Sequence, residues 1–194
     1  MYHIRKDKRS MESSGYLYDA LASWMGEKQF ETITVTEVVT RAKLGRATFY
    51  RNFSSLDDIL RWQCDEAFRG LYVYLLEYYQ LNNSVADTFR VPFLKPFLRY
   101  WYIHSRIMEL LIQANRLDIA HDSFMKMFEL ISQHVDRSHE VIWAHLDYFA
   151  AVRAGTAINI LIQWIKNDKN IPPDELADLI VHQMIESLHL NLLL

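Results

Sequence analysis

The amino-acid sequence predicts an all-α protein, with a small helix-turn-helix domain at residues 1–55 and a larger helical domain at 56–194. Three observations predict this fold class. Apolar residues recur at three- and four-residue spacing almost throughout, which is the period of an α-helix. Sustained apolar–polar alternation and hairpin-forming Asn-Gly or Asp-Gly pairs are both missing from the sequence. Only 5 glycines and 4 prolines interrupt the 194 residues.

Composition limits the classes of protein to consider. Apolar residues make up 51% of the chain and charged residues 23%, so it can build a sizeable core and is not intrinsically disordered. The single cysteine, Cys64, excludes an internal disulfide framework. The charged N-terminal residues are unlike a signal peptide, and no run of about 18 apolar residues exists. We therefore expect a soluble, cytoplasmic protein with no membrane partner.

About nine helices are expected, separated by short loops. A loop is expected at residues 82–84 and a turn at 167–170, and Pro172 and Pro173 lead into the last helix, where proline is tolerated. Pro92 and Pro96 are expected to bend or delay the fifth helix. The expected helices span 10–25, 35–42, 46–52, 56–79, 86–103, 105–115, 118–136, 139–167 and 174–192.

The second and third helices are short and form the most informative motif. Thr34 and Glu37 have the spacing of a capping box, which starts the second helix at residue 35. The sequence 43–45 is a three-residue turn that contains glycine. Phe49 and Phe53 follow at i, i+4 and are expected to face inward. Two short helices joined by such a turn form a helix-turn-helix.

The rest of the third helix is expected to be exposed and to contact DNA. Arginine can bind guanine through two hydrogen bonds, asparagine can bind adenine, and alanine or threonine methyl groups can contact thymine. The N-terminal residues of a recognition helix lie nearest the bases. The alternative is an ordinary helical hairpin with a solvated polar face. The expected exposed residues are Arg46, Ala47, Thr48, Tyr50, Arg51 and Asn52.

Charge is distributed unevenly along the chain. The formal net charge is −3, which argues against nucleic-acid binding when taken alone. Residues 1–53, however, contain nine basic and six acidic side chains and carry +3, so residues 54–194 carry −6. This asymmetry favours an anionic partner, double-stranded DNA, for the first segment, although a surplus of three charges is also compatible with chance.

The segment from about residue 10 to 65 resembles the DNA-binding domain of the TetR/AcrR family of transcriptional regulators. The Thr-Phe-Tyr and Ile-Leu-x-Trp sequences also resemble a branch of the family that contains dihydroxyacetone-kinase regulators. The resemblance implies that Tyr50 contacts phosphate and that Thr36, on the second helix, lies at the base edges. Thr34, at the start of the same helix, is a further candidate for DNA contact. The matching residues are Leu21, Trp24, Phe30, Thr34, Val35, Val38, Ala42, Leu44, Thr48, Phe49, Tyr50, Phe53 and Leu60.

The sequence departs from the family pattern at four positions. Lys43 and Gly45 replace the usual glycine and serine, so the third helix loses its serine cap, and Asn52 replaces a histidine. Leu56 replaces a lysine that contacts phosphate in the family. Four basic residues near the N-terminus are candidates to supply that contact instead: Arg5, Lys6, Lys8 and Arg9.

The last two helices are expected to form a homodimer interface. The helix at 139–167 has two apolar stripes, and a helix that is apolar on both sides must be buried on both. Small residues on one stripe allow a partner helix to approach closely. The alternative is burial wholly within one subunit. The expected interface residues are Tyr148, Ala151, Gly155, Ile158, Ile162, Ile180 and Met184.

The middle helices are rich in aromatic residues and suggest an effector pocket. Pockets for small molecules are mostly apolar with a few polar groups, here His104 and Arg153, the latter facing an acidic or phosphorylated ligand. The alternative is a solid core in which His104 is hydrogen-bonded and Arg153 pairs with Glu129 or Asp147. The candidate pocket residues are Tyr100, Trp101, His104, Phe128, Trp143 and Arg153.

These observations predict a DNA-binding transcriptional regulator that binds a palindromic operator as a homodimer and responds to a small molecule. The family resemblance implies that it is a repressor. The alternative is a regulator of this kind, either an activator or a repressor, that is controlled by a protein partner. No phosphate-binding loop or nucleophile motif favours a helical enzyme, and no cofactor is expected. Two groups of histidines and acids lack the spacing of a metal site: Asp118, His121 and Asp122, and His134, Asp136 and His139.

Overall fold

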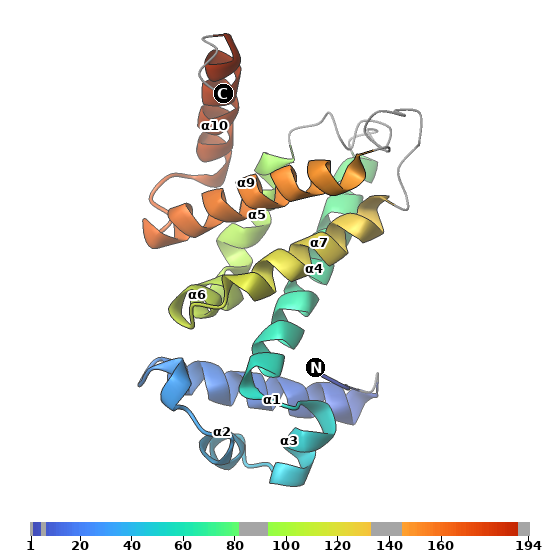
Figure 1. The fold of residues 1–194 in the computed structure, drawn as a ribbon, viewed down its shortest axis with the longest axis vertical. Coiled ribbons are helices and arrows are strands. Elements are labelled where there is room, and N and C mark those ends of the chain that lie inside the picture. The colour runs from blue at the N-terminus through green and yellow to red at the C-terminus, as the bar shows by residue number, and fades with distance from the viewer. Residues whose placement is uncertain (1, 5–6, 82–92, 133–144, 190–194) are drawn as a thin grey trace. The chain divides into compact units, whose positions relative to one another are not determined.

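A computed structural model describes residues 2–4, 7–81, 93–132 and 145–189. Within these ranges the chain forms nine α-helices and one short 3-10 helix, and no strand (Figure 1). The all-α prediction is therefore confirmed. No helix in this part of the chain is both long and apolar enough to cross a membrane.

The elements follow the predicted order closely. The bounds are α1 Lys8–Met25, η1 Phe30–Thr32, α2 Val35–Arg41, α3 Arg46–Asn52, α4 Leu56–Leu81, α5 Leu94–His104, α6 Arg106–Gln113, α7 Leu117–Ser132, α9 Leu146–Lys166 and α10 Pro173–His189. Most differences from the predicted bounds are one to three residues. The predicted starts of the fifth and eighth helices, at 86 and 139, lie outside the described residues.

Local chemistry explains where several helices begin and end. Asp7 caps α1 by accepting a hydrogen bond from the Ser10 amide at 2.9 Å, so this helix begins before the predicted residue 10. Pro96 lies in the first turn of α5, where a missing amide hydrogen costs no helical bond. Lys43 adopts a left-handed conformation with φ +53° directly after α2. The Leu44 amide then donates to the Val39 carbonyl, which completes a Schellman motif.

The chain divides into two compact units, of which the first is Met1–Phe68 with Arg106–Phe124. Its core includes Phe49, Phe53 and Leu60, all fully buried, and Cys64 is buried among them. This unit therefore contains the whole helix-turn-helix motif together with α6 and the first part of α7. The predicted functional boundary at residue 55 stays a prediction, because compactness does not identify the residues that bind DNA.

The second unit is Arg69–Ser105 with Met125–Leu194. Its core contains fully buried Phe97 and Trp101 on α5 and Ala154 and Leu161 on α9. Helix α10 packs against α5 (Figure 1). Lys95 pairs with Asp178 at 2.7 Å and Arg99 pairs with Asp174 at 2.6 Å, so two ion pairs hold the first turns of α10 on α5.

Candidate nucleic-acid interface

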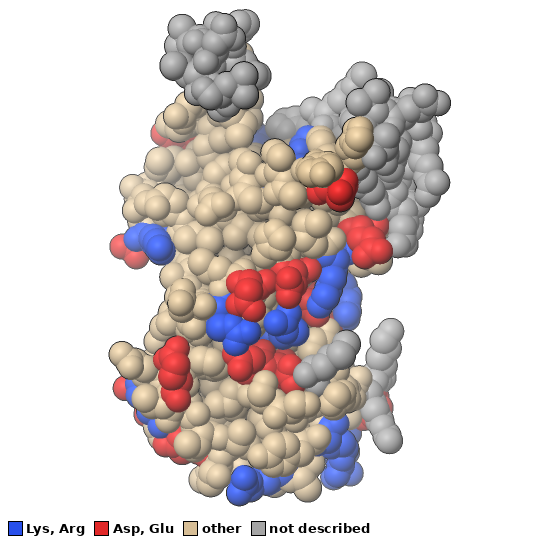
Figure 2. Space-filling view, in the orientation of Figure 1, with Lys and Arg blue, Asp and Glu red and all other residues tan. Residues whose placement is uncertain are grey.

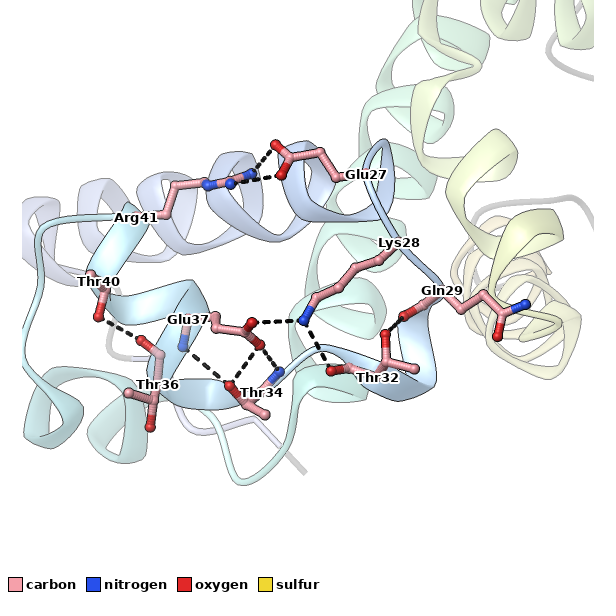
Figure 3. A network of polar contacts seen from close by, with 9 residues as sticks. All are labelled: Glu27, Lys28, Gln29, Thr32, Thr34, Thr36, Glu37, Thr40 and Arg41. Carbon is pink, nitrogen blue, oxygen red and sulfur yellow. Dashed lines mark hydrogen bonds and ion pairs between the residues drawn. The ribbon is translucent and has the colours of Figure 1, made fainter.

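The second helix is fixed by the predicted capping box. The Thr34 hydroxyl accepts a hydrogen bond from the Glu37 amide at 3.3 Å, and the Glu37 carboxylate accepts one from the Thr34 amide at 2.9 Å (Figure 3). Two backbone amides at the helix start, those of Thr34 and Glu37, thus gain hydrogen-bond partners from each other's side chains. Because its hydroxyl is occupied by the cap, the Thr34 side chain has mainly its methyl group left for a contact outside the protein.

A lysine reinforces this cap from the preceding segment. Lys28 Nζ donates to Glu37 Oε1 at 2.7 Å and to the Thr32 carbonyl at 3.1 Å (Figure 3). The hydrogen bond from Lys28, followed by those from Thr34, lowers the pKa of Glu37 from 4.5 to about 2. The carboxylate therefore stays ionised at neutral pH, and Lys28 is engaged within the protein.

The end of α2 is tied to α1 by an arginine. The Arg41 guanidinium lies 3.5 Å from the centre of the Trp24 ring and forms a bidentate pair with Glu27 at 2.7 and 3.0 Å. It also donates to the Ser23 hydroxyl at 2.9 Å. The hydrogen bond from Arg41 lowers the pKa of Glu27. Arg41 is thus a structural residue that orients α2, and the sequence pattern alone did not distinguish it from a phosphate-binding arginine.

The third helix has one buried and one exposed face. Phe49 and Phe53 are fully buried, and their ring centres are 6.0 Å apart, as predicted. On the opposite face Arg46, Ala47 and Arg51 are exposed, Thr48 is half-buried and Tyr50 is 51% exposed. Gly45 precedes the helix without a side-chain cap, which confirms the expected loss of the serine cap.

The positive charge of this region is available on one side of α2–α3. Arg46 and Arg51 of α3 and Lys43 of the preceding turn are exposed and make no ion pair within the described residues. Figure 2 shows Lys and Arg side chains over α2 and α3 at the lower edge of the view. Thr36 on α2 is also exposed, so two helices can contact one DNA groove.

Asn52 is a correction to the prediction. It was expected on the exposed face, but its side chain is only 2% exposed. The N-terminal segment passes close to it, and the His3 amide donates to the Asn52 carbonyl at 2.8 Å. Asn52 is the last residue of α3, where the helix turns toward α4, so it faces the protein interior and cannot contact a base edge in this conformation.

Hydrogen bonds anchor the described part of the N-terminal segment. The Tyr2 hydroxyl donates to Asp65 Oδ2 on α4 at 2.6 Å, and the Ser123 hydroxyl of α7 donates to Asp65 Oδ1 at 2.6 Å. His3 Nε2 lies 3.3 Å from the Ser54 hydroxyl. Of the four basic N-terminal candidates, Lys8 and Arg9 are exposed at the start of α1, while Arg5 and Lys6 lie outside the described residues.

The start of α4 offers no phosphate-binding lysine. Leu56 is half-buried, and the first turn contains Asp57 and Asp58 instead of basic residues. Asp58 is buried and accepts a hydrogen bond from the Ser54 amide at 2.9 Å, and Asp57 pairs with Arg116. The first turn of α4 therefore carries acidic side chains in the region where the family pattern has a phosphate-binding lysine.

Within the described part of the chain, the predicted effector residues do not all line the same cavity. Tyr100 and His104 line an open cavity of about 560 Å³ in the second unit, and their ring centres are 4.4 Å apart. Trp101 is fully buried, so it is not an exposed wall of that cavity. Its position four residues from Phe97 on the same helix places it in the core instead. The cavity includes residues that the sequence interpretation missed: Gly70, Tyr74, Glu77 and Arg99.

The other predicted pocket residues lie elsewhere in the second unit. Phe128 is buried, with its ring centre 6.0 Å from that of Phe149. The Arg153 guanidinium lies 4.8 Å from the centre of the Phe149 ring, so it stacks on an aromatic residue and does not line the cavity. Trp143 lies outside the described residues. Among the described residues, no group of three His, Cys, Asp or Glu side chains could hold a metal ion.

The expected dimer face is only partly exposed. Tyr148 is 72% exposed, Ala151 is exposed, Gly155 and Ile180 are half-exposed and Met184 is 40% exposed. Ile158 and Ile162 are corrections, because both are buried within this chain. The exposed stripe of α9 follows the 3.6-residue helical repeat through Tyr148, Val152, Gly155, Asn159 and Gln163. The predicted stripe used a slightly shorter spacing, so its later residues, Ile158 and Ile162, lie on the core side of the helix.

An all-α chain with this motif belongs to the class of helix-turn-helix regulators. The family model TetR_C_8, described as "Transcriptional regulator C-terminal region", matches residues 91–187. The chain therefore belongs to the TetR family of transcriptional regulators, which are DNA-binding proteins and not enzymes.

The fold is also that of a solved structure. The crystal structure of Lin0861 from Listeria innocua superposes with a TM-score of 0.69 at 17% identity, with 94% of each chain covered. A search of curated proteins gave no match. The family model thus gives the family expected from residues 10–65, although it matches residues 91–187.

Proposed function

We propose that this regulator binds a two-fold symmetric operator through α2 and α3 and that it acts as a homodimer. The proposal rests mainly on the two faces of α3: one is buried and aromatic, and the other exposes two arginines that form no ion pair with any described residue. Arg46 and Ala47 in the first turn of α3 contact base edges. Tyr50 and Arg51 contact phosphates, and Thr36 contributes from α2.

Dimerisation involves the exposed apolar residues of α9 and α10. Tyr148 and Val152 on α9 are 72% and 68% exposed, and Leu179, Met184 and Ile185 on α10 are 51%, 40% and 50% exposed. Exposed apolar residues gathered on two helices are typical of a protein interface. A two-fold dimer would present two α3 helices about 34–36 Å apart, matching successive major grooves.

A small-molecule effector changes operator affinity, with repression as the default mode. The effector binds in the second unit, where the cavity beside Tyr100 and His104 offers an apolar, aromatic wall. A protein partner would instead cover exposed apolar surface. Selection in the presence of purified small molecules distinguishes the two, because only an effector shifts the operator affinity without another protein.

The test begins with selection of bound DNA from a random pool, followed by Arg46→Ala. We expect loss of discrimination at one base pair of each half-site, about 1–3 kcal/mol. Lys166→Ala is a matched control that removes an exposed positive charge from α9. Equal weakening of Arg46→Ala on all sequences would assign Arg46 to a phosphate, and no enriched sequence at all would refute the proposal.

A further inference from the structure

The cavity in the second unit is built around one aromatic side chain. It lies between the second half of α4, α5 and the start of α10. The ring centre of Tyr100 is 5.8 Å from that of Tyr74 and 4.4 Å from that of His104. Burial raises the pKa of Tyr100 to about 12, so its ring is an uncharged phenol at neutral pH. Three rings from two helices thus gather at this cavity.

A glycine makes this arrangement possible. Gly70 lies in the interior of α4, where glycine destabilises a helix by about 1 kcal/mol relative to alanine. A Cβ atom at residue 70 would overlap the Tyr100 hydroxyl. The missing side chain therefore allows the Tyr100 ring to lie against the α4 backbone at the cavity wall.

Among the described residues that line the cavity, one acidic side chain has no oppositely charged partner. Arg99 Nε and Nη2 each donate to a carboxylate oxygen of Asp174 at 2.6 Å. That bidentate pair raises the pKa of Arg99 and lowers the pKa of Asp174, so the two charges cancel. Glu77 also lines the cavity, is exposed, and makes no hydrogen bond or ion pair within the described residues.

We propose that this cavity binds an organic cation with an apolar body, such as an aromatic quaternary ammonium compound, and that this ligand is the effector. The faces of Tyr74 and Tyr100 attract a cation through their quadrupoles, and Glu77 adds the opposite charge. An anionic ligand would have to displace Asp174 from Arg99, losing two charge-assisted hydrogen bonds. The role as effector rests on the proposed function, whereas the binding preference does not.

The test uses three probes of the same shape and different charge. Phenyltrimethylammonium, tert-butylbenzene and benzenesulfonate are titrated into the full-length protein by calorimetry. We expect the cation to bind about 3- to 30-fold more tightly than the uncharged isostere, as cation–π attraction predicts. The sulfonate should bind least. Equal affinity for the cation and its isostere, or preference for the sulfonate, would overturn the proposal.

Variants then assign the preference to named side chains. Tyr100→Leu should lose most of the cation's advantage, whereas Tyr100→Phe keeps the aromatic face and should bind within about twofold of the original chain. Glu77→Gln should weaken cation binding about two- to fivefold, since the carboxylate is exposed. Glu186→Gln, an exposed acid on α10 outside the cavity lining, is the matched control.

A final measurement separates this inference from the proposed function. Operator affinity is measured with and without saturating phenyltrimethylammonium, using DNA from the random-pool selection. Cation binding that changes operator affinity supports both ideas. DNA binding without any cation binding overturns the ligand class and leaves the regulator intact. Cation binding to a protein that enriches no DNA contradicts the proposed function but not the site.

Discussion

The α2–α3 region and the α9–α10 region present opposite kinds of surface. In α2–α3 the apolar side chains point inward and the exposed side chains are mainly polar or cationic, such as Arg46 and Arg51. In α9–α10 large apolar side chains such as Tyr148 and Ile185 are exposed. A cationic surface suits a polyanion and an apolar surface suits a second protein. The difference supports the proposal that one surface binds DNA and the other binds a second copy of this chain.

The two regions also differ in what determines their shape. The polar contacts that fix the start of α2 join residues close in sequence, such as Thr34 with Glu37 and Lys28 with Glu37 (Figure 3). The contacts that hold α10 on α5 join distant residues, such as Arg99 with Asp174. Short-range contacts are easier to recognise in a sequence, so the first region was predicted more accurately than the second.

The largest expected effect comes from removing the core of the first region. Phe49→Ala should lower the free energy of unfolding by about 3–5 kcal/mol, because Phe49 is fully buried. Tyr50→Ala, at a neighbouring residue that is 51% exposed, should cost about 1 kcal/mol or less while weakening DNA binding. Denaturant unfolding and DNA titration of both variants test this contrast. Similar destabilisation by both would contradict the two-faced description of α3.

A charged side chain on the exposed apolar surface of α9 and α10 should weaken the proposed dimer. Val152→Asp combined with Ile185→Asp should raise the dimer dissociation constant at least about tenfold, because a carboxylate buried without a partner costs about 1–3 kcal/mol or more. Analytical ultracentrifugation measures the dissociation constant. Met11→Asp provides a matched control on α1, where Met11 is 37% exposed. A dimer that survives the double change would place the interface elsewhere.

The N-terminal anchor should have an intermediate effect. Tyr2→Phe removes the hydrogen bond to Asp65 and should cost about 1–2 kcal/mol of unfolding free energy. Ser13→Ala, which removes an exposed hydroxyl that donates to the Arg9 carbonyl, is the control. Asp65→Asn completes a double-mutant cycle, in which the coupling energy isolates the Tyr2–Asp65 pair. Additive effects of the two changes would show that Tyr2 acts independently of Asp65.

The sequence predicted most of the fold because the signals are local. The capping box at Thr34 and Glu37 and the inward pair Phe49 and Phe53 are confirmed in detail. The extra turn η1 was missed, since three residues carry too little periodicity to detect. The family was also identified correctly, from residues 10–65, whereas the family model matches residues 91–187.

The site was predicted less completely because its residues depend on distant contacts. Asn52 looks exposed on a helical wheel, yet its side chain is buried at the end of α3, where its backbone carbonyl accepts a hydrogen bond from the distant His3 amide. Glu77 and Gly70 line the cavity with Tyr100 although they are on another helix. Arg153 interrupts an apolar stripe, but a stripe does not reveal that Phe149 lies under its guanidinium.

A small stabilisation is expected at the turn before α3. Lys43 has φ +53°, a left-handed conformation that disfavours side chains with a Cβ and suits glycine. Lys43→Gly should therefore raise the free energy of unfolding by up to about 1 kcal/mol, partly offset by the more flexible unfolded chain. Lys43→Ala is the control, since it removes the charge but keeps the Cβ. Thermal unfolding of both variants is measured. A gain in stability for Lys43→Gly that is absent for Lys43→Ala comes from the backbone conformation and not from the lost charge.

The smallest effect concerns the pH dependence of the capping box. Because the pKa of Glu37 is lowered from 4.5 to about 2, its ionised form stabilises the folded state above pH 4.5, and this contribution is lost as the pH falls toward 2. Glu37→Gln keeps the hydrogen-bonding shape without the charge, so its unfolding midpoint should lie slightly below that of the original chain at neutral pH. The two midpoints should converge in acid. Glu31→Gln, which removes an exposed carboxylate without a hydrogen bond or ion pair among the described residues, should show less convergence. If the difference between the two unfolding midpoints stayed constant from pH 7 to pH 2, the charge of Glu37 would not contribute to stability. Glu37 would then stabilise α2 through the shape of its hydrogen bonds alone, and the ion pair with Lys28 would add nothing.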